Sequence, residues 1–366
     1  MKRIFADCHV FDGKYQGTRT YIEGLYKELI AKGDHHFYLA SSDPAHLEKV
    51  FGSHQNVTYL KYRFKGGMMR LLLDAPRLIL KNKIDAAHFQ YRVPPLKFCR
   101  YIVTTHDVLF EDFPEYFSRS DRFMSYWTYR LSAKYSDVVL TVSEYSRQKI
   151  KEHLGVDNVF ITPNGVAEKF FEEYDQEEIK KEVFQRFGFQ DHILYTSRWE
   201  PRKNQHLLLR AFVEAGLYTT RHLVFIGGKT FENKAYDDYY NNLSPEIQKK
   251  VINKGVVNND DALLLLRGAA LFVYPSVAEG FGIPPLEAIA ANVPTISSNR
   301  TSMADFDFIG DHFFDPDNCQ ELKNKMIMAL QHANNGSRQQ KQLAVKARYT
   351  WKQCAIAFTK AIQGKI

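Results

Sequence analysis

The stretch LFVYPSVAEGFGIPPLEA, which spans residues 271–288, joins a short apolar run to a segment of helical composition. Residues 271–274 have the aromatic and β-branched character of a buried strand. Gly280 and Gly282 allow a backbone path that a side chain would block, and the Pro-Pro pair after them suits the first turn of a helix. The stretch therefore predicts a strand, a tight loop and a helix, the repeating unit of a parallel α/β sheet.

The same alternation of short apolar runs and helical periods continues outward in both directions. Strands are predicted in the first half at 3–8, 36–40, 57–60, 86–90, 101–105, 138–142 and 159–162, and in the second half at 192–197, 222–226, 254–257, 271–274 and 295–298. Helices are predicted near 204–215, 260–270, 284–291 and 351–362, and after the N-caps Thr18, Ser120 and Ser143. This pattern predicts an α/β protein with two facing, doubly wound, Rossmann-like sheets.

A turn signal, Pro-Asn-Gly at 163–165, separates the two series, and the acidic stretch 168–181 after it is interpreted as a hinge. We predict domains at 1–167 and 168–348. The amphipathic last segment, 349–366, is predicted to be a helix that packs on one of them.

Composition excludes several classes of protein. The chain has 366 residues, of which 45% are hydrophobic and 25% charged, enough for about two packed cores and too apolar for wholesale disorder. Its longest apolar runs fall short of the roughly 20 residues of a membrane-spanning helix. Asp7 and His9 interrupt what would be the core of a signal peptide, so we expect a cytoplasmic protein. Four scattered cysteines predict free thiols, and a net charge of +7 favours an anionic partner.

Functional side chains should follow strands, because ligands of open parallel sheets lie beyond the carboxyl ends of the strands. Arg198 and Lys203 flank the start of a helix after the strand at 192–197, where the helix dipole disfavours unpaired cations. A bound diphosphate would remove this conflict, since Arg198 offers a bidentate fork and Lys203 a point charge. The alternative is that Arg198 pairs with Glu200 or a neighbouring acid.

Glu279 and Glu287 are the carboxylates of the 271–288 stretch, with seven residues between them. Both are expected to face one ligand across the helix start, where carboxylates suit ribose hydroxyls. The alternative is that Glu287 only complements the helix dipole. Lys203 and Glu287 are expected to be exposed at a ligand cleft, so that folding does not depend on them.

In the first half, His106 ends the strand at 101–105 and is a candidate to donate to a substrate hydroxyl or transfer a proton, although a structural histidine is an equal alternative. The loop at 12–19 offers glycines and cations before the first helix but lacks the GxGxxG spacing. A nicotinamide-dependent dehydrogenase is therefore disfavoured.

With these residues together, the chain resembles the retaining glycosyltransferases of family 4, which have the GT-B fold. The resemblance rests on the Arg198 and Lys203 pair, the Glu279 and Glu287 string, Gly-Val-Val at 255–257 with the acidic pair that follows, His-Asp at 106–107 and Val-Ser-Glu at 142–144, in the family's order over nearly the whole chain. It implies an acceptor-side domain at 1–167, a nucleotide-sugar domain at 168–348 and a last helix, 349–366, that returns to the first domain.

The resemblance also implies roles for single residues. Arg198 and Lys203 would bind the diphosphate, Glu287 the ribose, Glu279 and the backbone of Phe281 and Gly282 the donor sugar, and His106 a sugar hydroxyl. We therefore predict catalytic and donor-binding residues as two sets. The catalytic set is His106, Arg198, Lys203 and Glu279, and the donor-binding set is Gly17, Phe281, Gly282, Ile283 and Glu287.

This sequence departs from the family's pattern in two places. Arg19 stands where a second glycine commonly follows Gly17, which affects close approach of the backbone to substrates. Asn292 stands where glycine often ends the helix, a mild change because asparagine also tolerates left-handed backbone. Two Asp-x-Asp triplets, at 305–307 and 315–317, match a metal pattern of another glycosyltransferase fold, but neither follows a clear strand. We expect no metal and no cofactor.

The function predicted from the resemblance is transfer of a hexose, with mannose from GDP-mannose as the first choice, to a glycan or lipid-linked acceptor of a surface polysaccharide. The alternatives are a sugar-nucleotide epimerase or phosphorylase of the same fold and a polyanion-binding protein. Nucleic acid is not expected as a partner. Basic and apolar residues alternate over 61–83, which makes an anionic membrane surface, at the inner face of the cell membrane, a further candidate partner.

Overall fold

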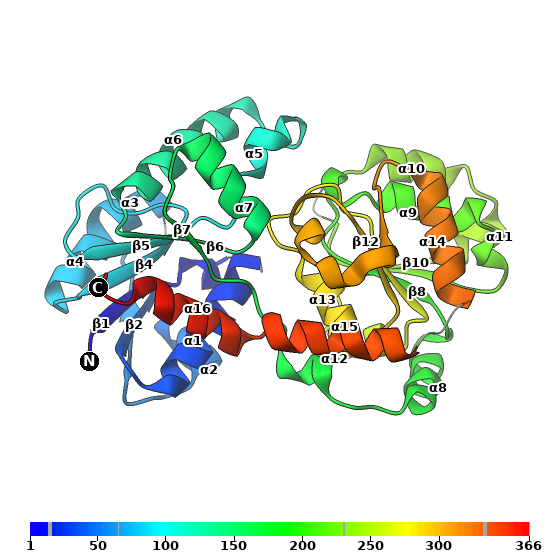
Figure 1. The fold of residues 1–366 in the computed structure, drawn as a ribbon, viewed down its shortest axis with the longest axis horizontal. Helices are drawn as coiled ribbons and strands as arrows, with labels where there is room; N and C mark the ends of the chain where they lie inside the picture. The colour runs from blue at the N-terminus through cyan, green and yellow to red at the C-terminus, as the bar shows by residue number, and fades with distance from the viewer. Residues whose placement is uncertain (14–16, 65, 230, 332–334, 366) are drawn as a thin grey trace. The chain divides into compact units, whose positions relative to one another are not determined.

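The structure, a computed structural model, describes residues 1–13, 17–64, 66–229, 231–331 and 335–365. The chain forms two compact units (Figure 1). Met1–Gly165 and Thr350–Ile366 make up the first unit, and Val166–Tyr349 makes up the second.

The first unit contains a parallel sheet, seven-stranded over its described residues, in the order β3-β2-β1-β4-β5-β6-β7. Its strands are β1 (Arg3–Asp7), β2 (His36–Ser41), β3 (Val57–Lys61), β4 (Ala86–Gln90), β5 (Arg100–Thr104), β6 (Val138–Thr141) and β7 (Val159–Ile161). Its helices are α1 (Gly17–Lys32), α2 (Pro44–Phe51), α3 (Gly67–Met69), α4 (Ala75–Lys81), α5 (Leu109–Asp112), α6 (Arg119–Tyr135), α7 (Glu144–Lys149) and α16 (Trp351–Ile362). Strand order reverses between β1 and β4, as in doubly wound folds.

The second unit repeats this design with the strand order β10-β9-β8-β11-β12-β13, six parallel strands in its described part. They are β8 (Ile193–Thr196), β9 (Leu223–Ile226), β10 (Val251–Gly255), β11 (Leu271–Tyr274), β12 (Thr295–Ser298) and β13 (Phe313–Phe314). The helices are α8 (Gln176–Phe187), α9 (Gln205–Glu214), α10 (Lys234–Asn241), α11 (Pro245–Gln248), α12 (Asn259–Arg267), α13 (Ile283–Ala290), α14 (Cys319–Gln331) and α15 (Asn335–Arg348). The reversal of strand order falls between β8 and β11.

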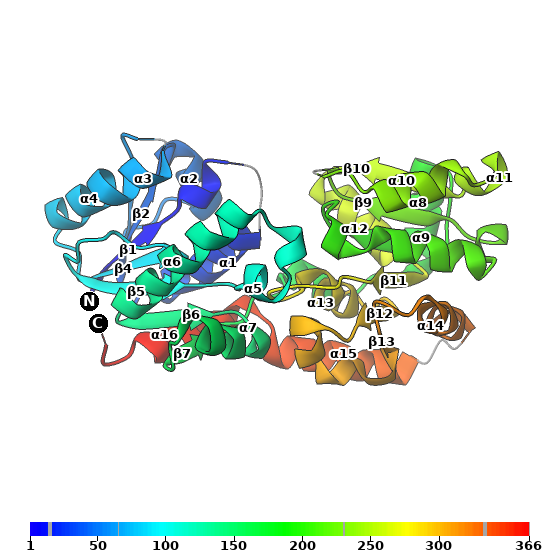
Figure 2. The same cartoon turned by 90° about the horizontal axis from the view of Figure 1, so that it is seen from above.

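Fully buried strands form the centre of the second unit's core. Every residue of β9, β11 and β12 is buried, which is the pattern of parallel strands covered on both faces. Around the second sheet, α9 packs against α10 and α14, and α13 packs against α15 (Figure 2). The predicted α/β class with two Rossmann-like sheets is confirmed.

Helix α16 belongs to the first unit, where it packs on α1. Two glycines make room for its first residue, Trp351. A Cβ atom at Gly24 of α1 would lie 2.0 Å from the Trp351 ring, and one at Gly165 would lie 2.2 Å from the Trp351 backbone nitrogen. The chain thus passes from one unit to the other after Gly165 and again after Tyr349. A backbone hydrogen bond from Val166 N to Tyr349 O, 2.8 Å long, joins the two ends of the second unit.

The structure corrects several predicted boundaries. Strand β10 spans Val251–Gly255 rather than the predicted 254–257, because Gly255 at φ +66° ends it. The two-residue strand β13 was not predicted. Helix α6 is capped by Ser118, whose hydroxyl accepts from the Asp121 N–H at 3.1 Å, and not by Ser120. The acidic stretch 168–181 is not a hinge, since it holds a 3-10 helix and the start of α8 within the second unit.

Candidate functional site

Both motifs of the second half follow the two strands between which the order of the sheet reverses. Arg198 and Lys203 lie in the loop after β8, and Glu279 lies in the loop after the neighbouring strand β11. In doubly wound sheets this reversal leaves a crevice at the carboxyl ends of the strands. The topology therefore brings together the side chains that the sequence predicted as one site.

The loop after β8 is held by ion pairs and by close backbone packing. Glu200 pairs with Arg198 and with Arg202, each at 2.7 Å. Gly227, after β9, has φ +139°, and a Cβ atom there would lie 1.9 Å from the Ser197 carbonyl oxygen. The pairing of Arg198 with Glu200, the alternative named from the sequence, is thus present, although the Arg198 side chain remains 47% exposed.

A buried ion cluster connects the two loops. Lys203 Nζ donates to Glu279 Oε1, and the Tyr274 hydroxyl donates to the same oxygen at 2.7 Å. Arg202 Nη1 lies 3.2 Å from Glu279 Oε2. Three cations, counting Arg198, thus face the two carboxylates of Glu200 and Glu279. The cluster has one positive charge in excess, which suits an anionic ligand.

Burial and charge act in opposite directions on these groups. Burial raises the pKa of Glu279, but the charges of Lys203 and Arg202 outweigh it and lower the pKa to about 2. Burial lowers the pKa of Lys203, and Glu279 opposes that shift. The expectation that Lys203 is exposed is wrong, because it is only 6% exposed and the ion pair compensates for its lost hydration.

The loop after β11 presents backbone donors at the start of α13. Gly282 caps this helix at φ +98°, a left-handed conformation that favours glycine. The next residue, Ile283, is the first of the helix, and the two prolines after it have no N–H group. The Phe281 ring is buried against Phe306 at 5.6 Å, so this segment offers a ligand its backbone and not its aromatic ring.

Two residues that sequence reasoning missed hold this loop in place. The Ser302 hydroxyl donates to the carbonyl oxygens of Glu279 and Phe281, at 2.9 and 2.7 Å. Thr301 Oγ1 accepts from the Glu279 N–H at 3.0 Å, and Thr301 itself has φ +56°, a strained conformation for a β-branched residue. Their position directly after β12, beside β11, was the signal that could have identified them.

Glu287 lies in the first turns of α13 and is half-buried. Burial raises its pKa to about 7, and the charge of Lys169 opposes this shift only weakly. Over the described residues, no hydrogen bond to its carboxyl group is found. Glu287 thus differs from Glu279, because it is free to accept hydrogen bonds from a ligand.

His106 follows β5 in the first unit and is buried between the rings of Tyr21 and Tyr91. Burial lowers its pKa to about 3, so the ring is neutral at physiological pH. Its Nε2 is 2.6 Å from Gln90 Oε1, which assigns the proton to Nε2. The nitrogen left for a ligand is Nδ1, which accepts a hydrogen bond rather than donating one.

Gln90 connects His106 to a buried polar network around the central strands β4 and β5. Gln90 Nε2 lies 3.3 Å from His88 Nε2, and His88 also forms hydrogen bonds with Tyr26 and Thr104, at 2.9 and 2.8 Å.

Gly17, predicted to bind the donor, is the exposed first residue of α1. The loop predicted to contact ligands at 12–19 includes residues 14–16, which lie outside the described residues.

The Asp-x-Asp triplets are occupied by ion pairs. Arg300 pairs with Asp315 and Asp317, at 2.7 and 2.6 Å, and Arg348 pairs with Asp307 at 2.7 Å. Within the described ranges, no group of three or more His, Cys, Asp or Glu side chains is placed to hold a metal ion. The four cysteines are free thiols, as predicted.

Comparisons with known proteins match both units. Residues 15–170 match the family described as Glycosyltransferase Family 4, and residues 176–348 match the family described as Glycosyl transferases group 1. O-antigen chain mannosyltransferase B of Escherichia coli is 26% identical over 301 residues, which are 78% of this chain and 78% of that protein. The serotype-specific mannosyltransferase WbdA of Escherichia coli is 28% identical over 59% of this chain but only 27% of its own length.

Solved structures agree on the architecture. Anabaena HepE in complex with UDP and glucose superposes with a TM-score of 0.74 at 16% identity, covering 99% of each chain. At this identity the likeness shows the fold, and the GT-B architecture predicted from the sequence is confirmed.

Proposed function

Because this chain belongs to the family 4 glycosyltransferases, we propose that it transfers a hexose from a nucleotide sugar to an acceptor hydroxyl with retention of the anomeric configuration. The observation that carries the proposal is the charged cluster after β8 and β11, with its excess cation. The helix after the second loop adds the carboxyl group of Glu287, to which no hydrogen bond is found among the described residues.

The cluster supplies the contacts that a diphosphate needs. Arg198 has N–H groups beyond those on Glu200 and is half exposed, so it can grip a phosphate as a fork. Lys203 uses its ammonium group on Glu279 and Tyr274, which leaves a third N–H for a phosphate oxygen. The backbone N–H groups at Phe281–Ile283 and the dipole of α13 add to this attraction.

Glu287 is assigned to the ribose and Glu279 to the donor sugar. A carboxylate accepts hydrogen bonds from two vicinal hydroxyls, and no hydrogen bond within the described part of the chain occupies either oxygen of Glu287. Glu279 is held by Lys203 and Arg202, so its role is to position the cations and the loop against the sugar. His106 Nδ1 accepts from a sugar hydroxyl in this proposal.

The proposed step is a front-face substitution. The acceptor oxygen forms a bond to the anomeric carbon while the bond from that carbon to the diphosphate oxygen breaks. The acceptor proton passes to the departing diphosphate, whose charge Arg198 and Lys203 stabilise. No carboxylate nucleophile is required, which fits the ion-paired state of Glu279.

The proposed donor is GDP-mannose, and the proposed acceptor is a glycan or lipid-linked precursor of a surface polysaccharide. The mannosyltransferase names of the two Escherichia coli relatives support this choice. HepE was solved with UDP and glucose, which supports a nucleotide diphosphate donor of this general kind.

A panel of nucleotide sugars tests the proposal. We expect GDP-mannose to raise the unfolding temperature more than UDP-glucose or ADP-glucose, because specific binding stabilises the folded state by mass action. Product analysis by NMR should then show an α-linked hexose in the presence of an acceptor. Turnover of the donor to an epimer or a sugar phosphate without an acceptor would identify an epimerase or phosphorylase instead.

Metal removal tests the expected absence of a cofactor. We expect EDTA to leave transfer largely intact, since the cluster and the helix N-terminus already neutralise the diphosphate. The measurement is the initial rate before and after EDTA treatment. A rate that falls to background and returns with Mg²⁺ or Mn²⁺ would contradict the expectation.

A further inference from the structure

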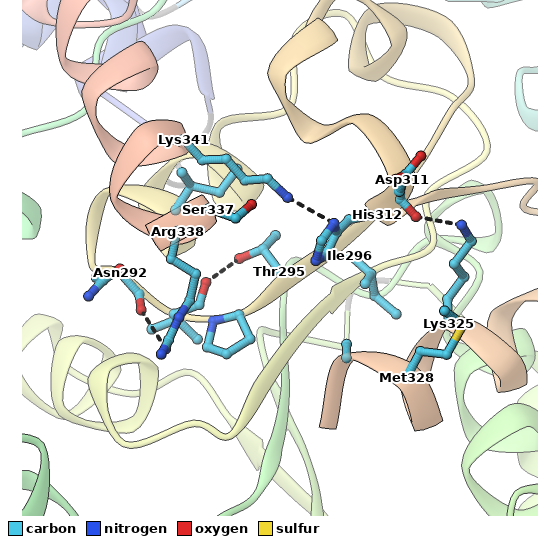
Figure 3. A pocket seen from close by; sticks show the side chains of 14 residues that line it. Asn292, Thr295, Ile296, Asp311, His312, Lys325, Met328, Ser337, Arg338 and Lys341 are labelled. Atoms are coloured by element: carbon cyan, nitrogen blue, oxygen red, sulfur yellow. Dashed lines mark hydrogen bonds between the residues drawn. The ribbon is translucent and has the colours of Figure 1, made fainter. Parts of the chain in front are cut away.

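A cavity of about 330 Å³ lies in the second unit (Figure 3). It lies at the end of the strands where β12 begins, whereas the candidate donor site lies at their carboxyl ends. Thr295, which begins β12, lines this cavity, whereas the donor loops follow the carboxyl ends of β8 and β11. The remaining walls come from the end of α13, from α14 and α15, and from the segment before β13. The cavity is therefore a separate feature of the same unit.

Basic side chains gather around this cavity without carboxylate partners. Lys325 of α14 donates to the Asp311 carbonyl oxygen at 2.5 Å, and Arg338 of α15 donates to the Asn292 carbonyl oxygen at 3.4 Å. Lys341 of α15 lies 2.8 Å from His312 Nδ1, with Lys341 and Arg338 both reaching in from α15 (Figure 3). In the described part of the chain, none of these three cations forms an ion pair with a carboxylate.

The positive charge is poorly compensated. Burial lowers the pKa of Lys341 to about 8, and the charge of Asp311 opposes this shift. Burial likewise lowers the pKa of Arg338. Arg338 Nε is buried and finds no hydrogen-bond partner among the described residues. Three cations against the single exposed carboxylate of Asp311 leave an excess of two charges, which is the charge of a phosphate monoester dianion.

Most of the remaining lining is apolar, although Asn292, Thr295 and Ser337 are polar. The apolar part is made of Ile289, Val293, Pro294, Ile296, Met328 and Ala329. An anion with an organic part would place its charged group among the cations and its apolar part against these side chains.

We propose that this cavity binds a small phosphate ester, with the phosphate held by Arg338 and Lys341 and the organic part resting on the apolar wall. Arginine offers a bidentate fork and lysine a point charge, a combination suited to three terminal phosphate oxygens. Lys325 and neutral His312 complete the ring of donors. The proposal concerns this cavity alone and does not depend on the reaction proposed for the donor site.

Calorimetry with phenyl phosphate and with inorganic phosphate, at constant ionic strength, tests the proposal. We expect saturable binding of phenyl phosphate, about tenfold tighter than that of inorganic phosphate because its ring is removed from water. Arg338→Met and Lys341→Met should each weaken phenyl phosphate binding about tenfold, through loss of one charge-assisted contact. Replacing half-buried cations by methionine should not impair folding, which the unfolding temperature will check.

Two control variants locate the binding. Lys249→Met removes an exposed lysine of the same unit outside the cavity and should leave binding unchanged. Arg198→Met removes a half-exposed cation of the donor loops and should also leave binding of phenyl phosphate in the cavity unchanged. Loss of binding in Arg198→Met with none in the cavity variants would assign the phosphate to the donor site. Absence of saturable binding, or equal affinity for the two probes, would overturn the proposal.

Discussion

Glu287 keeps a proton at a pH where most glutamates have lost it. Its pKa is raised to about 7 by burial, from an ordinary value of 4.5. The folded protein therefore binds this proton between pH 4.5 and 7 while the unfolded chain does not. The free energy of unfolding falls as pH rises through this window, by about 2 kcal/mol for a half-buried group.

Glu287→Gln should remove this pH dependence. We expect urea titrations at pH 5 and pH 7.5 to show a loss of stability in the wild type that exceeds the loss in Glu287→Gln by about 1 to 2 kcal/mol. A nucleoside diphosphate should bind the wild type more tightly as pH rises through 7, beyond any trend seen in the variant, because the carboxylate is the better acceptor. Parallel pH profiles of wild type and variant would contradict both statements.

Lys203 and Glu279 give a second prediction at the scale of the residue. Lys203→Ala leaves Glu279 buried beside fewer cations, so we expect a loss of about 3 kcal/mol in the free energy of unfolding together with loss of transfer. The double variant Lys203→Met with Glu279→Gln should regain much of the stability but not the activity. Chemical unfolding and initial rates measure the two effects separately.

A double variant as unstable as Lys203→Ala would show that the ion pair is not the cause of the instability. Arg198→Lys serves as the matched control, because Arg198 is half exposed and its replacement should lower activity without a comparable loss of stability.

Residue types and spacing predicted Arg198, Lys203, Glu279 and Glu287 as candidate site residues, but they could not give the burial or the partners of each group. The buried pair of Lys203 and Glu279 depends on two loops that are more than seventy positions apart in sequence, which only the sheet order brings together. Thr301 and Ser302 escaped notice for a similar reason. Their hydrogen bonds join the loop after β12 to the loop after the neighbouring strand β11. No local sequence motif predicts such contacts.

Helices and strands were predicted well where one apolar run lies between turn residues. They were predicted poorly where the strand is very short or where two residues suit the same cap position. Strand β11 was located to the residue because four apolar positions sit between turn residues. Strand β13 has two residues and forms only by pairing with Ser297 and Ser298 of β12. Ser118 and Ser120 are equally good N-caps in sequence, and the backbone geometry chose Ser118.

The segment 61–83 is the least regular element of the first unit. It forms α3, a π-helical turn at Arg70–Asp74, and α4, in whose first turn Pro76 lies. Leu78 and Ile79 are buried in the core, and Arg70 pairs with Asp7 at 3.3 Å. Six other apolar residues of the segment are exposed. They are Phe64, Met68, Met69, Leu72, Leu73 and Leu80, and Met68 is exposed by 75%. No helix among the described residues has the length and apolarity to cross a membrane.

A second exposed apolar surface lies on α6 of the same unit. Phe123, Trp127, Leu131 and Tyr135 recur every four residues along one side of the helix, and Phe123 is 70% exposed. Aromatic side chains with basic neighbours suit the surface of a membrane.

We predict that acidic vesicles bind this protein at low salt through the exposed part of segment 61–83. Met68→Ser with Leu72→Ser should lower the vesicle-bound fraction about tenfold, because two apolar side chains are lost from the interface. Sedimentation at low and moderate salt measures the effect, and screening should weaken it. Phe184→Ser, an exposed apolar residue of α8, is the control.

The α6 variant Phe123→Ser with Trp127→Ser separates the two surfaces. If only this variant loses vesicle binding, the docking surface lies on α6 and not on segment 61–83. Equal recovery in the supernatant with neutral and acidic vesicles would exclude docking through either.

On the scale of the whole molecule, α16 completes the first unit from the far end of the chain. We predict that Gly24→Ala displaces Trp351 and destabilises the first unit by about 2 kcal/mol, since the new Cβ would overlap the indole ring. Hydrogen exchange should show loss of protection in α1 and α16 and no change in the second unit. Gly67→Ala, where a Cβ atom meets nothing within 4 Å, is the control.

If hydrogen exchange in α16 of Gly24→Ala is unchanged, the Trp351 ring moves aside without loss of stability. Increased exchange throughout the second unit would mean that the two units unfold together, which contradicts independent cores.

The hydrogen bond from Val166 N to Tyr349 O has a consequence for how the protein is made. It joins the two ends of the second unit, which is an insertion within the first because the first unit resumes at Thr350. A ribosome therefore synthesises most of the first unit, then the entire second unit, and only then the residues of α16. The second unit can therefore fold while the first is still incomplete, with α1 uncovered until residues 350–366 have left the exit tunnel.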